Sequence, residues 1–371
     1  MSSSSSKMTL FYMLTNSFEL WPDAYECSEN TKYPETRWPR FGIYLISSGS
    51  ILIVLYSLCF IAIFKVKKLS PAYQLMLILS VFDITSLSVG SVITGFLTYH
   101  GIFFCQYPRF FYISGCIAMF TWLTNCVTCI ILAIERCAEV NPRFFLYFLF
   151  ERRVFKLVLL FISVYGINSL MFSKPVIFSP EYSTFVFDPM IGKDPTLYTN
   201  SWLTVNNLMI AVSSTTLYFY LCYYLIFKFG YSTSMWLYKS KRQVFISDFF
   251  GIFRKFTKFQ IVMQGVIMCL FHSAAACVYE YMAYFSSPLY LIVTGQTLWQ
   301  LASGCLSVVY LTLNRTIKNS VVKMVIPKAI RKKFGLHIGV EELLEIERAA
   351  DNGGVSSLNA AGFIVKFDNF V

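Results

Sequence analysis

Seven apolar runs, each about as long as a membrane-spanning helix, are the strongest constraint on how this chain folds. A helix of roughly 20 apolar residues crosses the ~30 Å hydrocarbon core of a bilayer. Runs six and seven are separated only by Ser286-Ser287-Pro288, where the proline favours a turn over one continuous helix. The sequence therefore predicts an all-α fold, a seven-transmembrane helix bundle. The seven predicted spans are 42–64, 75–97, 111–134, 155–172, 205–227, 261–285 and 289–313.

The composition agrees with a membrane protein. Of the 371 residues, 56% are hydrophobic and 14% are charged, whereas an average soluble domain has about 25% charged residues. The net charge of +11 does not indicate a nucleic-acid partner, because the basic residues lie between the apolar runs. The partner expected from composition is therefore the lipid bilayer and not nucleic acid.

Lysine and arginine are distributed unequally between the two sides of the predicted bundle. One side of the bundle has few basic residues: its loops hold only Arg109, Lys174 and Lys193, and the N-terminal segment adds four more. Because loops rich in Lys and Arg stay in the cytosol, we expect the N-terminus outside and the C-terminus in the cytosol. The segments that hold most of the 31 basic residues are 65–68, 136–156, 228–258 and 315–333.

The chain is predicted to have three parts. Residues 1–41 form an extracellular N-terminal segment, and residues 42–313 form the seven-helix bundle. Residues 314–371 form a cytosolic tail with a helix on the membrane surface, followed by disorder. A short charged helix is expected at 341–350, and disorder after Asp351, because Gly, Asn and Ser are frequent there.

Charged residues within or at the end of the spans are candidates for function. Asp83 lies inside the second span, where a carboxylate costs roughly 2.5–3.5 kcal/mol to insert. It is expected to face the bundle and to bind an ion, a water cluster or a polar partner; a tolerated protonated carboxyl is the alternative. Glu135 and Arg136 end the third span. They form either an ionic latch that opens to admit a G protein, or an interfacial pair whose arginine extends to the headgroups.

Cysteine usage predicts one disulfide and no metal site. Nine of the 11 cysteines lie in spans or on the inner side, where a free cysteine behaves as a small apolar residue. Cys27 and Cys105 are outside, in an oxidising compartment, so they are predicted to form a disulfide. No His/Cys/Asp cluster has the spacing of metal ligands, and no catalytic motif is found. Neither an enzyme activity nor a metal or other cofactor is expected.

Side chains at helical spacing predict a ligand site in the outer half or the middle of the bundle. A mostly apolar pocket with a few polar groups suits a small molecule, although ordinary aromatic packing is the alternative for each residue taken singly. The candidates are Tyr112, Met119 and Trp122, with Gly115, in the third span, His272, Tyr279 and Glu280 in the sixth, and Gln296, Trp299 and Gln300 in the seventh.

Short motifs in a fixed order resemble those of a known family. The pieces are Pro71, Tyr73, Met76 and Asp83, then 101–108 (GIFFCQYP), 112–115 (YISG), Trp122, 135–137 (ERC), 149–150 (LF), 299–300 (WQ) and 310–315 (YLTLNR). With these pieces in this order, the chain from about residue 27 to residue 318 resembles the nematode serpentine chemoreceptors of class T, a divergent branch of the seven-helix G-protein-coupled receptors.

The resemblance implies a chemosensory receptor in the plasma membrane of a sensory cell, with a small chemical ligand and a heterotrimeric G protein as partners. Asp83 resembles the sodium-site aspartate of rhodopsin-like receptors, and Glu135-Arg136 resembles their acidic-arginine latch. Two departures put the rhodopsin-like switch in doubt. The segment 307–310 (SVVY) lacks the Asn and Pro of the usual signature, and the sixth span has no Cys-Trp-x-Pro.

Two other function classes are open on sequence grounds. A seven-helix ligand-gated ion channel would have the inverted topology, with its N-terminus inside, which the Lys and Arg distribution opposes. A transporter would show internal repeats and paired Gly/Pro interruptions, and the spans have almost no proline. The predicted function is therefore a G-protein-coupled chemoreceptor, with the ion channel as the alternative.

Overall fold

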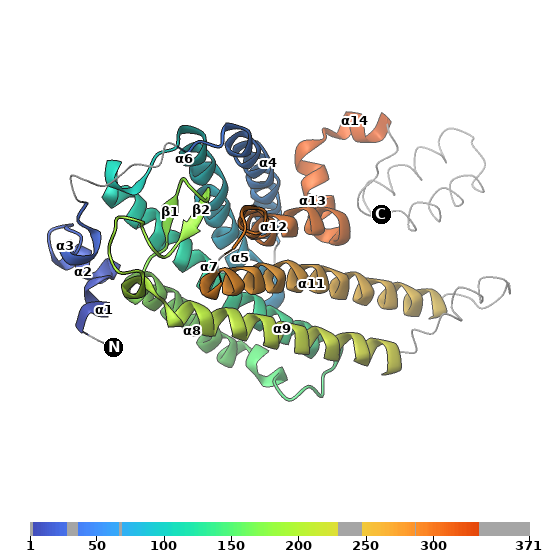
Figure 1. The fold of residues 1–371 in the computed structure, drawn as a ribbon. Helices are drawn as coiled ribbons and strands as arrows, with labels where there is room; N and C mark the ends of the chain where they lie inside the picture. Colours follow the sequence, from blue (N-terminus) through green and yellow to red (C-terminus); the bar gives the residue numbers. More distant parts are fainter. Residues whose placement is uncertain (1–2, 28–35, 67–68, 229–246, 286, 334–371) are drawn as a thin grey trace. The chain divides into compact units, whose positions relative to one another are not determined.

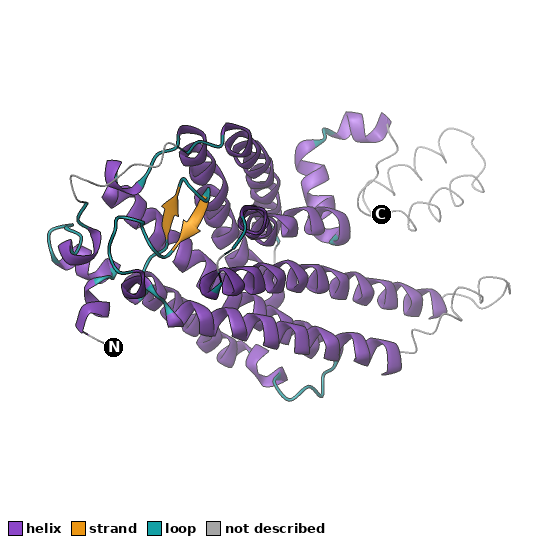
Figure 2. Ribbon diagram, viewed as in Figure 1, coloured by secondary structure: helices purple, strands orange, loops and turns teal. Residues whose placement is uncertain are grey.

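The structure, a computed structural model, describes residues 3–27, 36–66, 69–228, 247–285 and 287–333. Most of these residues are helical (Figure 2). The chain divides into two units, Met1–Val308 and Val309–Val371. The first unit contains the helices of the predicted bundle, except for the last residues of the final one (Figure 1).

All seven predicted spans are helical. Five helical segments of the described residues are long and apolar enough to cross a membrane, namely those at Pro39–Phe64, Pro71–His100, Pro108–Val140, Arg152–Phe172 and Met263–Tyr284. The helices are α4 (Pro39–Phe64), α5 (Pro71–Leu87) with α6 (Thr94–His100), α7 (Pro108–Val140), α8 (Arg152–Phe172), α9 (Ser201–Lys228), α11 (Ser247–Tyr284) and α12 (Leu289–Leu313).

Local sequence explains where several helices begin and end. Proline is the first residue of α4, α5 and α7, where its missing N–H costs no hydrogen bond and its fixed φ suits the helix. The Ser70 hydroxyl also accepts a hydrogen bond from the Tyr73 amide at the start of α5. Gly101 ends α6 in the left-handed conformation, with a φ of 66°, which a glycine adopts without strain.

The second predicted span is not one regular helix. Between α5 and α6 the chain forms a π-helical segment, η1 (Ser88–Ile93), which the sequence did not predict. Near it, α6 approaches α4 closely: a Cβ on Gly42 would lie 2.6 Å from the Gly95 carbonyl oxygen, and one on Gly95 would lie 2.8 Å from that of Gly42. Two small residues therefore let the two backbones touch, as is common between membrane helices.

Helix α7 is the centre of the first unit. It contacts α5, α8, α9 and α11. In its most apolar stretch 72% of the residues are buried, whereas the share is 28% in the corresponding stretches of α4 and α8. The outer faces of α4 and α8 present large apolar side chains, such as Ile51 and Leu157, that are more than half exposed in the isolated chain. That pattern suits helices whose outer face contacts lipid.

The loop between α8 and α9 contains a small sheet, which the all-α prediction did not include. Strands β1 (Ile177–Ser179) and β2 (Thr184–Val186) pair antiparallel, with Phe178 opposite Phe185. We call the end of the bundle that carries this hairpin and Cys27–Cys105 the hairpin end, and the end at which α7 finishes the Arg136 end. The remaining short elements of this unit are α1 (Ser3–Lys7), α2 (Leu10–Thr15), α3 (Pro22–Tyr25), η2 (Phe104–Gln106), η3 (Tyr147–Phe150) and η4 (Pro195–Tyr198).

The second unit contains the amphipathic helix α13 (Arg315–Val325), followed by α14 (Lys328–Lys333). The Asn314 side chain caps α13 by accepting a hydrogen bond from the Ile317 amide at 3.1 Å. The predicted charged helix at 341–350 and the predicted disorder after Asp351 lie outside the described residues. So do the side chains of the basic residues at 239–242 and 254–258.

Candidate functional site

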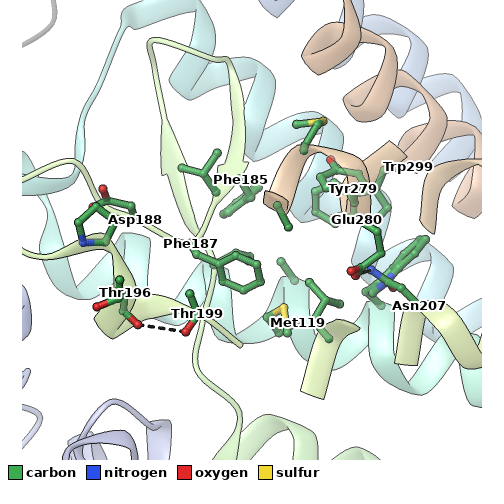
Figure 3. Close-up of a pocket in the computed structure, with 18 residues that line it drawn as sticks. Met119, Phe185, Phe187, Asp188, Thr196, Thr199, Asn207, Tyr279, Glu280 and Trp299 are labelled. Carbon is green, nitrogen blue, oxygen red and sulfur yellow. Dashed lines mark hydrogen bonds between the residues drawn. The ribbon is translucent and has the colours of Figure 1, made fainter. Parts of the chain in front are cut away.

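A cavity of about 370 Å³ lies at the hairpin end, between the hairpin loop and helices α7, α9, α11 and α12 (Figure 3). Its volume is within the usual range for small-molecule sites, and its lining is mostly apolar, as is typical of them. The lining residues are Ala118, Met119 and Trp122 of α7; Val176, Phe185, Val186, Phe187, Asp188, Pro195, Thr196 and Thr199 of the loop; Leu203 and Asn207 of α9; Tyr279, Glu280, Met282 and Ala283 of α11; and Trp299 of α12.

The hairpin is fixed over the cavity by close packing and hydrogen bonds. A Cβ on Gly115 would lie 1.7 Å from the Val176 carbonyl oxygen, so only glycine lets the loop backbone rest directly on α7. The Thr184 hydroxyl donates a 2.7 Å hydrogen bond to Gln296 Oε1 of α12. The Phe185 ring packs edge-on against Trp299, with the ring centroids 5.8 Å apart. The roof of the cavity is therefore attached to α7 and α12 at separate points.

A chain of polar groups crosses one wall of the cavity. Trp122 Nε1 donates a 2.8 Å hydrogen bond to Asn207 Oδ1, and Asn207 Nδ2 donates one of 2.8 Å to Glu280 Oε1. The first bond orients the Asn207 amide, so that its NH₂ group faces the carboxylate. Figure 3 shows Asn207 and Glu280 side by side, with Asp188 on the opposite side of the cavity. Sequence analysis did not identify Asn207 as a site residue, although a polar residue within an apolar span indicates a possible functional position.

Apart from Gly115, which holds the loop backbone, five of the nine residues predicted to bind ligand line this cavity: Met119, Trp122, Tyr279, Glu280 and Trp299. The other four lie elsewhere in the bundle. Tyr112 packs against Tyr25 of α3, with the ring centroids 5.1 Å apart. His272 is fully buried beneath Trp122, with the two rings stacked at 5.9 Å.

Gln296 and Gln300 connect helices rather than line the cavity. Gln296 Nε2 donates a 2.6 Å hydrogen bond to the Gly90 carbonyl oxygen, inside the π-helical segment. Gln300 Nε2 donates to Ser48 Oγ of α4 at 2.9 Å. Both glutamines are buried, so their amides stabilise the packing of α12 against its neighbours.

Asp83 lies in a closed polar cluster in the middle of the bundle. Its Oδ2 accepts a 2.5 Å hydrogen bond from Tyr56 of α4, and its Oδ1 accepts one of 2.6 Å from Asn125 Nδ2 of α7. Asp83 is fully buried and Asn125 nearly so. Of the alternatives that the sequence left open for Asp83, the polar partner is present, and it joins α5 to two other helices. An ion bound there stays a prediction.

The predicted disulfide between Cys27 and Cys105 is present, with a Cα–Cα distance of 6.0 Å and a sequence separation of 78 residues. It connects the N-terminal segment to the residues just before α7. The neighbouring Tyr25 ring packs against Tyr112 and Tyr198, and the Tyr198 hydroxyl donates to the Ala24 carbonyl oxygen. Among the described residues there is no group of three or more His, Cys, Asp and Glu side chains that could hold a metal ion.

A protein-family model described as "Serpentine type 7TM GPCR chemoreceptor Srt" matches residues 8–257 and 252–334, which together make up most of the chain. The chain belongs to the Srt chemoreceptor family. The resemblance seen in the sequence is thereby confirmed, and this Srt receptor is a multi-pass membrane protein of a receptor family, not of an enzyme family.

The Srt receptor is also similar to individual known proteins. It is 25% identical to "Serpentine receptor class T-55" of Caenorhabditis elegans over 307 residues, which cover 79% of this chain and 78% of that protein. Its fold is similar to that of squid rhodopsin, with a TM-score of 0.53 and 14% identity, covering 83% of this chain and 90% of the rhodopsin chain. At that identity the likeness supports the seven-helix fold alone.

At the Arg136 end of the Srt receptor, one arginine faces two carboxylates. Arg136 Nη1 lies 2.7 Å from Glu139 Oε2 and 3.6 Å from Glu135 Oε2. The Glu135 side chain is 10% exposed and that of Glu139 is 44% exposed. The sequence predicted the Glu135–Arg136 pair but missed Glu139, which makes the shorter contact. The i, i+3 spacing from Arg136 was the available signal.

Proposed function

We propose that this chain is a G-protein-coupled chemoreceptor of the plasma membrane of a sensory cell. In this proposal a small chemical ligand binds in the cavity at the hairpin end, and a heterotrimeric G protein binds at the Arg136 end. The observation that carries the proposal is the cavity itself: about 370 Å³ of mostly apolar space with a few oriented polar groups, on a receptor fold.

The proposed orientation has the hairpin end and the N-terminus outside the cell. The Cys27–Cys105 disulfide supports it, because disulfides persist in an oxidising compartment. The Lys and Arg distribution supports it independently, since most basic residues belong to the loops and the tail that the sequence predicts on the cytosolic side. A tag at the N-terminus should be labelled by antibody on intact cells, and a tag at the C-terminus only after permeabilisation. The reverse pattern would refute this orientation and favour the ion-channel alternative.

The proposed coupling assigns Arg136 to the G protein. Arginine stays charged and offers five directed donors, so it can exchange Glu135 and Glu139 for carbonyl oxygens of an inserted helix. A ligand drives this exchange only if it binds the open state more tightly than the closed state. The contacts of Arg136 with two carboxylates support a closed state held by this residue.

The experiment that tests the ligand site fills the cavity from α7. Ala118 lines the cavity and is 2% exposed, so Ala118→Phe puts a ring into the space a ligand needs. Ile113 lies on the same helix with its side chain 38% exposed, so Ile113→Phe is the matched control. The measurement is the second-messenger response to a library of small molecules, at matched surface expression.

We expect Ala118→Phe to weaken the response at least about tenfold, because the added ring occupies volume that the ligand would fill, while Ile113→Phe leaves it unchanged. An unchanged concentration response in Ala118→Phe would exclude this cavity as the ligand site. Loss of the response in both variants at full surface expression would also contradict the assignment of the cavity as the ligand site, because Ile113 does not line the cavity.

A further inference from the structure

The charged residues that line the cavity are all acidic. Asp188 and Glu280 belong to the lining, and no lysine, arginine or histidine of the described residues does. Lys174, in the same loop as Asp188, instead donates hydrogen bonds to the carbonyl oxygens of Leu197 at 2.6 Å and Thr199 at 3.1 Å. The cavity of a protein with a net charge of +11 is therefore lined by the opposite charge.

The Glu280 carboxylate has a neutral donor and no cationic partner within the described part of the chain. Its Oε1 accepts from the Asn207 amide, which the Trp122 indole holds in that orientation. The ion pairs found among the described residues are both those of Arg136, at the opposite end of the bundle. Glu280 is half-buried and lines the cavity, so a ligand reaches it without displacing a salt bridge.

Aromatic rings line the same space. Trp122, Phe185, Phe187, Tyr279 and Trp299 all belong to the lining, and they come from three helices and the hairpin. An aromatic face attracts a cation within about 6 Å of the ring centre, and tryptophan does so best. Rings on several sides together with a carboxylate make a site that is favourable for an organic cation. The same surroundings disfavour an anion, which would meet like charge and no positive partner.

We propose that the ligand of this cavity is an organic cation, a protonated amine on an apolar body, whose ammonium group binds Glu280 beside Asn207. The apolar body packs among the aromatic rings, and Asp188 on the far side favours entry of positive charge. This inference rests on the proposed function, because it names the chemical class that the same cavity takes.

The charge preference of the cavity is measurable without knowing the ligand. A reporter thiol is introduced by Met119→Cys, since Met119 lines the cavity, in a background with Cys277→Ser to remove the exposed free cysteine. Purified receptor in nanodiscs is treated with methanethiosulfonate reagents that carry an ammonium, a methyl or a sulfonate group. Modification rates are normalised to those of a free thiol, and the parent protein without the reporter is the blank.

We expect the ammonium reagent to modify the reporter at least about tenfold faster than the sulfonate reagent. The reason is that a carboxylate in a partly desolvated site attracts the cation and repels the anion. Glu280→Gln should bring the ratio close to one, and Asp188→Asn should lower it less. Glu181→Gln, which neutralises an exposed carboxylate of the same loop outside the cavity, should leave it unchanged. A ratio of one or below in the wild type, or a ratio unaffected by Glu280→Gln, would overturn the inference.

A competition arm separates this inference from the proposed function. The probes are 2-phenylethylamine and 2-phenylethanol, which have the same shape but differ in charge. The amine should protect the reporter thiol at a concentration at least about tenfold below that of the alcohol, because a charge-assisted hydrogen bond is worth more than a neutral one. Protection by both at equal concentrations would refute the cation preference and leave the cavity as a ligand site. A response that survives Ala118→Phe would instead refute the site itself.

Discussion

Asp83 and Glu280 are carboxylates on two helices of the same bundle, and each accepts a hydrogen bond from an asparagine amide. Asn125 donates to Asp83 at 2.6 Å, and Asn207 donates to Glu280 at 2.8 Å. The second oxygen of Asp83 is occupied by the Tyr56 hydroxyl, and the residue is fully buried. Glu280 is half-buried at the wall of a cavity of about 370 Å³.

A carboxylate hydrogen-bonded to an asparagine amide thus occurs twice: at Asp83 both carboxylate oxygens are occupied (the closed pair), and at Glu280 the carboxylate borders a cavity (the open pair). A fully satisfied polar network in a low-dielectric interior rigidifies the packing around it. At Asp83 the network joins three helices, α4, α5 and α7, and leaves no carboxylate oxygen without a donor. At Glu280 the asparagine orients the carboxylate, and the adjacent space remains for another group. We expect the closed pair to govern stability and the open pair to govern ligand recognition.

The largest effect is expected from breaking the covalent link at the hairpin end. The disulfide closes a loop of 78 residues, which in the chain-entropy model stabilises the fold by about 4–5 kcal/mol. Cys105→Ser should therefore lower the melting temperature of the purified receptor strongly and disturb the cavity before the Asp83 cluster. Thermal unfolding of Cys277→Ser, which removes an exposed free thiol, is the control. Equal melting temperatures for the two variants would show that the disulfide does not stabilise the hairpin end, which contains the Glu280–Asn207 pair.

Truncating each carboxylate to alanine should distinguish the closed pair from the open pair by the loss of stability. Asp83→Ala removes the carboxylate that accepts from both the Tyr56 hydroxyl and the Asn125 amide, and losing a buried hydrogen-bond partner costs roughly 1–3 kcal/mol. Glu280→Ala leaves only the Asn207 amide, next to a cavity that water can enter, so the loss should stay below about 1 kcal/mol. The two variants are compared by thermal unfolding in the same lipid. An equal loss in both would remove the distinction between the pairs.

Glu135 and Glu139 repeat the contrast around a single arginine. Glu139 makes the 2.7 Å contact but is 44% exposed, whereas Glu135 lies at 3.6 Å and is 10% exposed. An exposed ion pair is worth roughly 0.2–1 kcal/mol, so Glu139→Gln should raise basal signalling by up to about fivefold. Glu135→Gln should raise it as well, because it weakens the same closed state, and Arg136→Ala should abolish stimulated signalling. Second-messenger levels at matched surface expression are measured, and wild-type behaviour in all three variants would leave these residues as an interfacial group.

Sequence reasoning succeeded where the signal is local or the choices are few. Apolar runs predict the helices, because length and hydropathy are properties of one segment. Cys27 and Cys105 were paired because the outer side offers no other thiol. Helical spacing predicted that Trp122, Tyr279 and Trp299 face one site, and all three line the cavity, while their role in binding a ligand stays a prediction.

The sequence could not provide the contacts that depend on packing between distant segments. The β1–β2 hairpin is two strands of three residues in a long loop, and its position depends on Gly115 of another element. Helical spacing places Gln296 and Gln300 on the same face as Trp299. Their amides nevertheless donate to the Gly90 carbonyl oxygen and to Ser48 of neighbouring helices. Periodicity assigns a face of a helix, while the neighbour that this face meets follows only from the fold.

The smallest effect is expected at Asp188, the second carboxylate of the cavity, which lies outside the spans. Burial raises the pKa of Asp188 above its usual value, although the Met190 amide donates to its Oδ1. A raised pKa means that the folded state holds the proton more tightly than the unfolded state, so stability falls as the pH rises from about 4 through the folded-state pKa. Because the group is half-buried and partly screened by solvent, the change in melting temperature should be small.

Asp188→Asn should remove that fall in melting temperature as the pH rises above about 4. Asp194 in the same loop provides a control of opposite sign. Hydrogen bonding from Thr196 lowers the pKa of Asp194, so its contribution is lost as the pH falls, and Asp194→Asn should remove a gain with rising pH. Thermal unfolding of the two variants against pH therefore distinguishes burial in the cavity from exposure in the loop. If Asp188→Asn follows the wild-type profile throughout, the cavity does not bury this carboxylate, and the acidic character of the site depends on Glu280 alone.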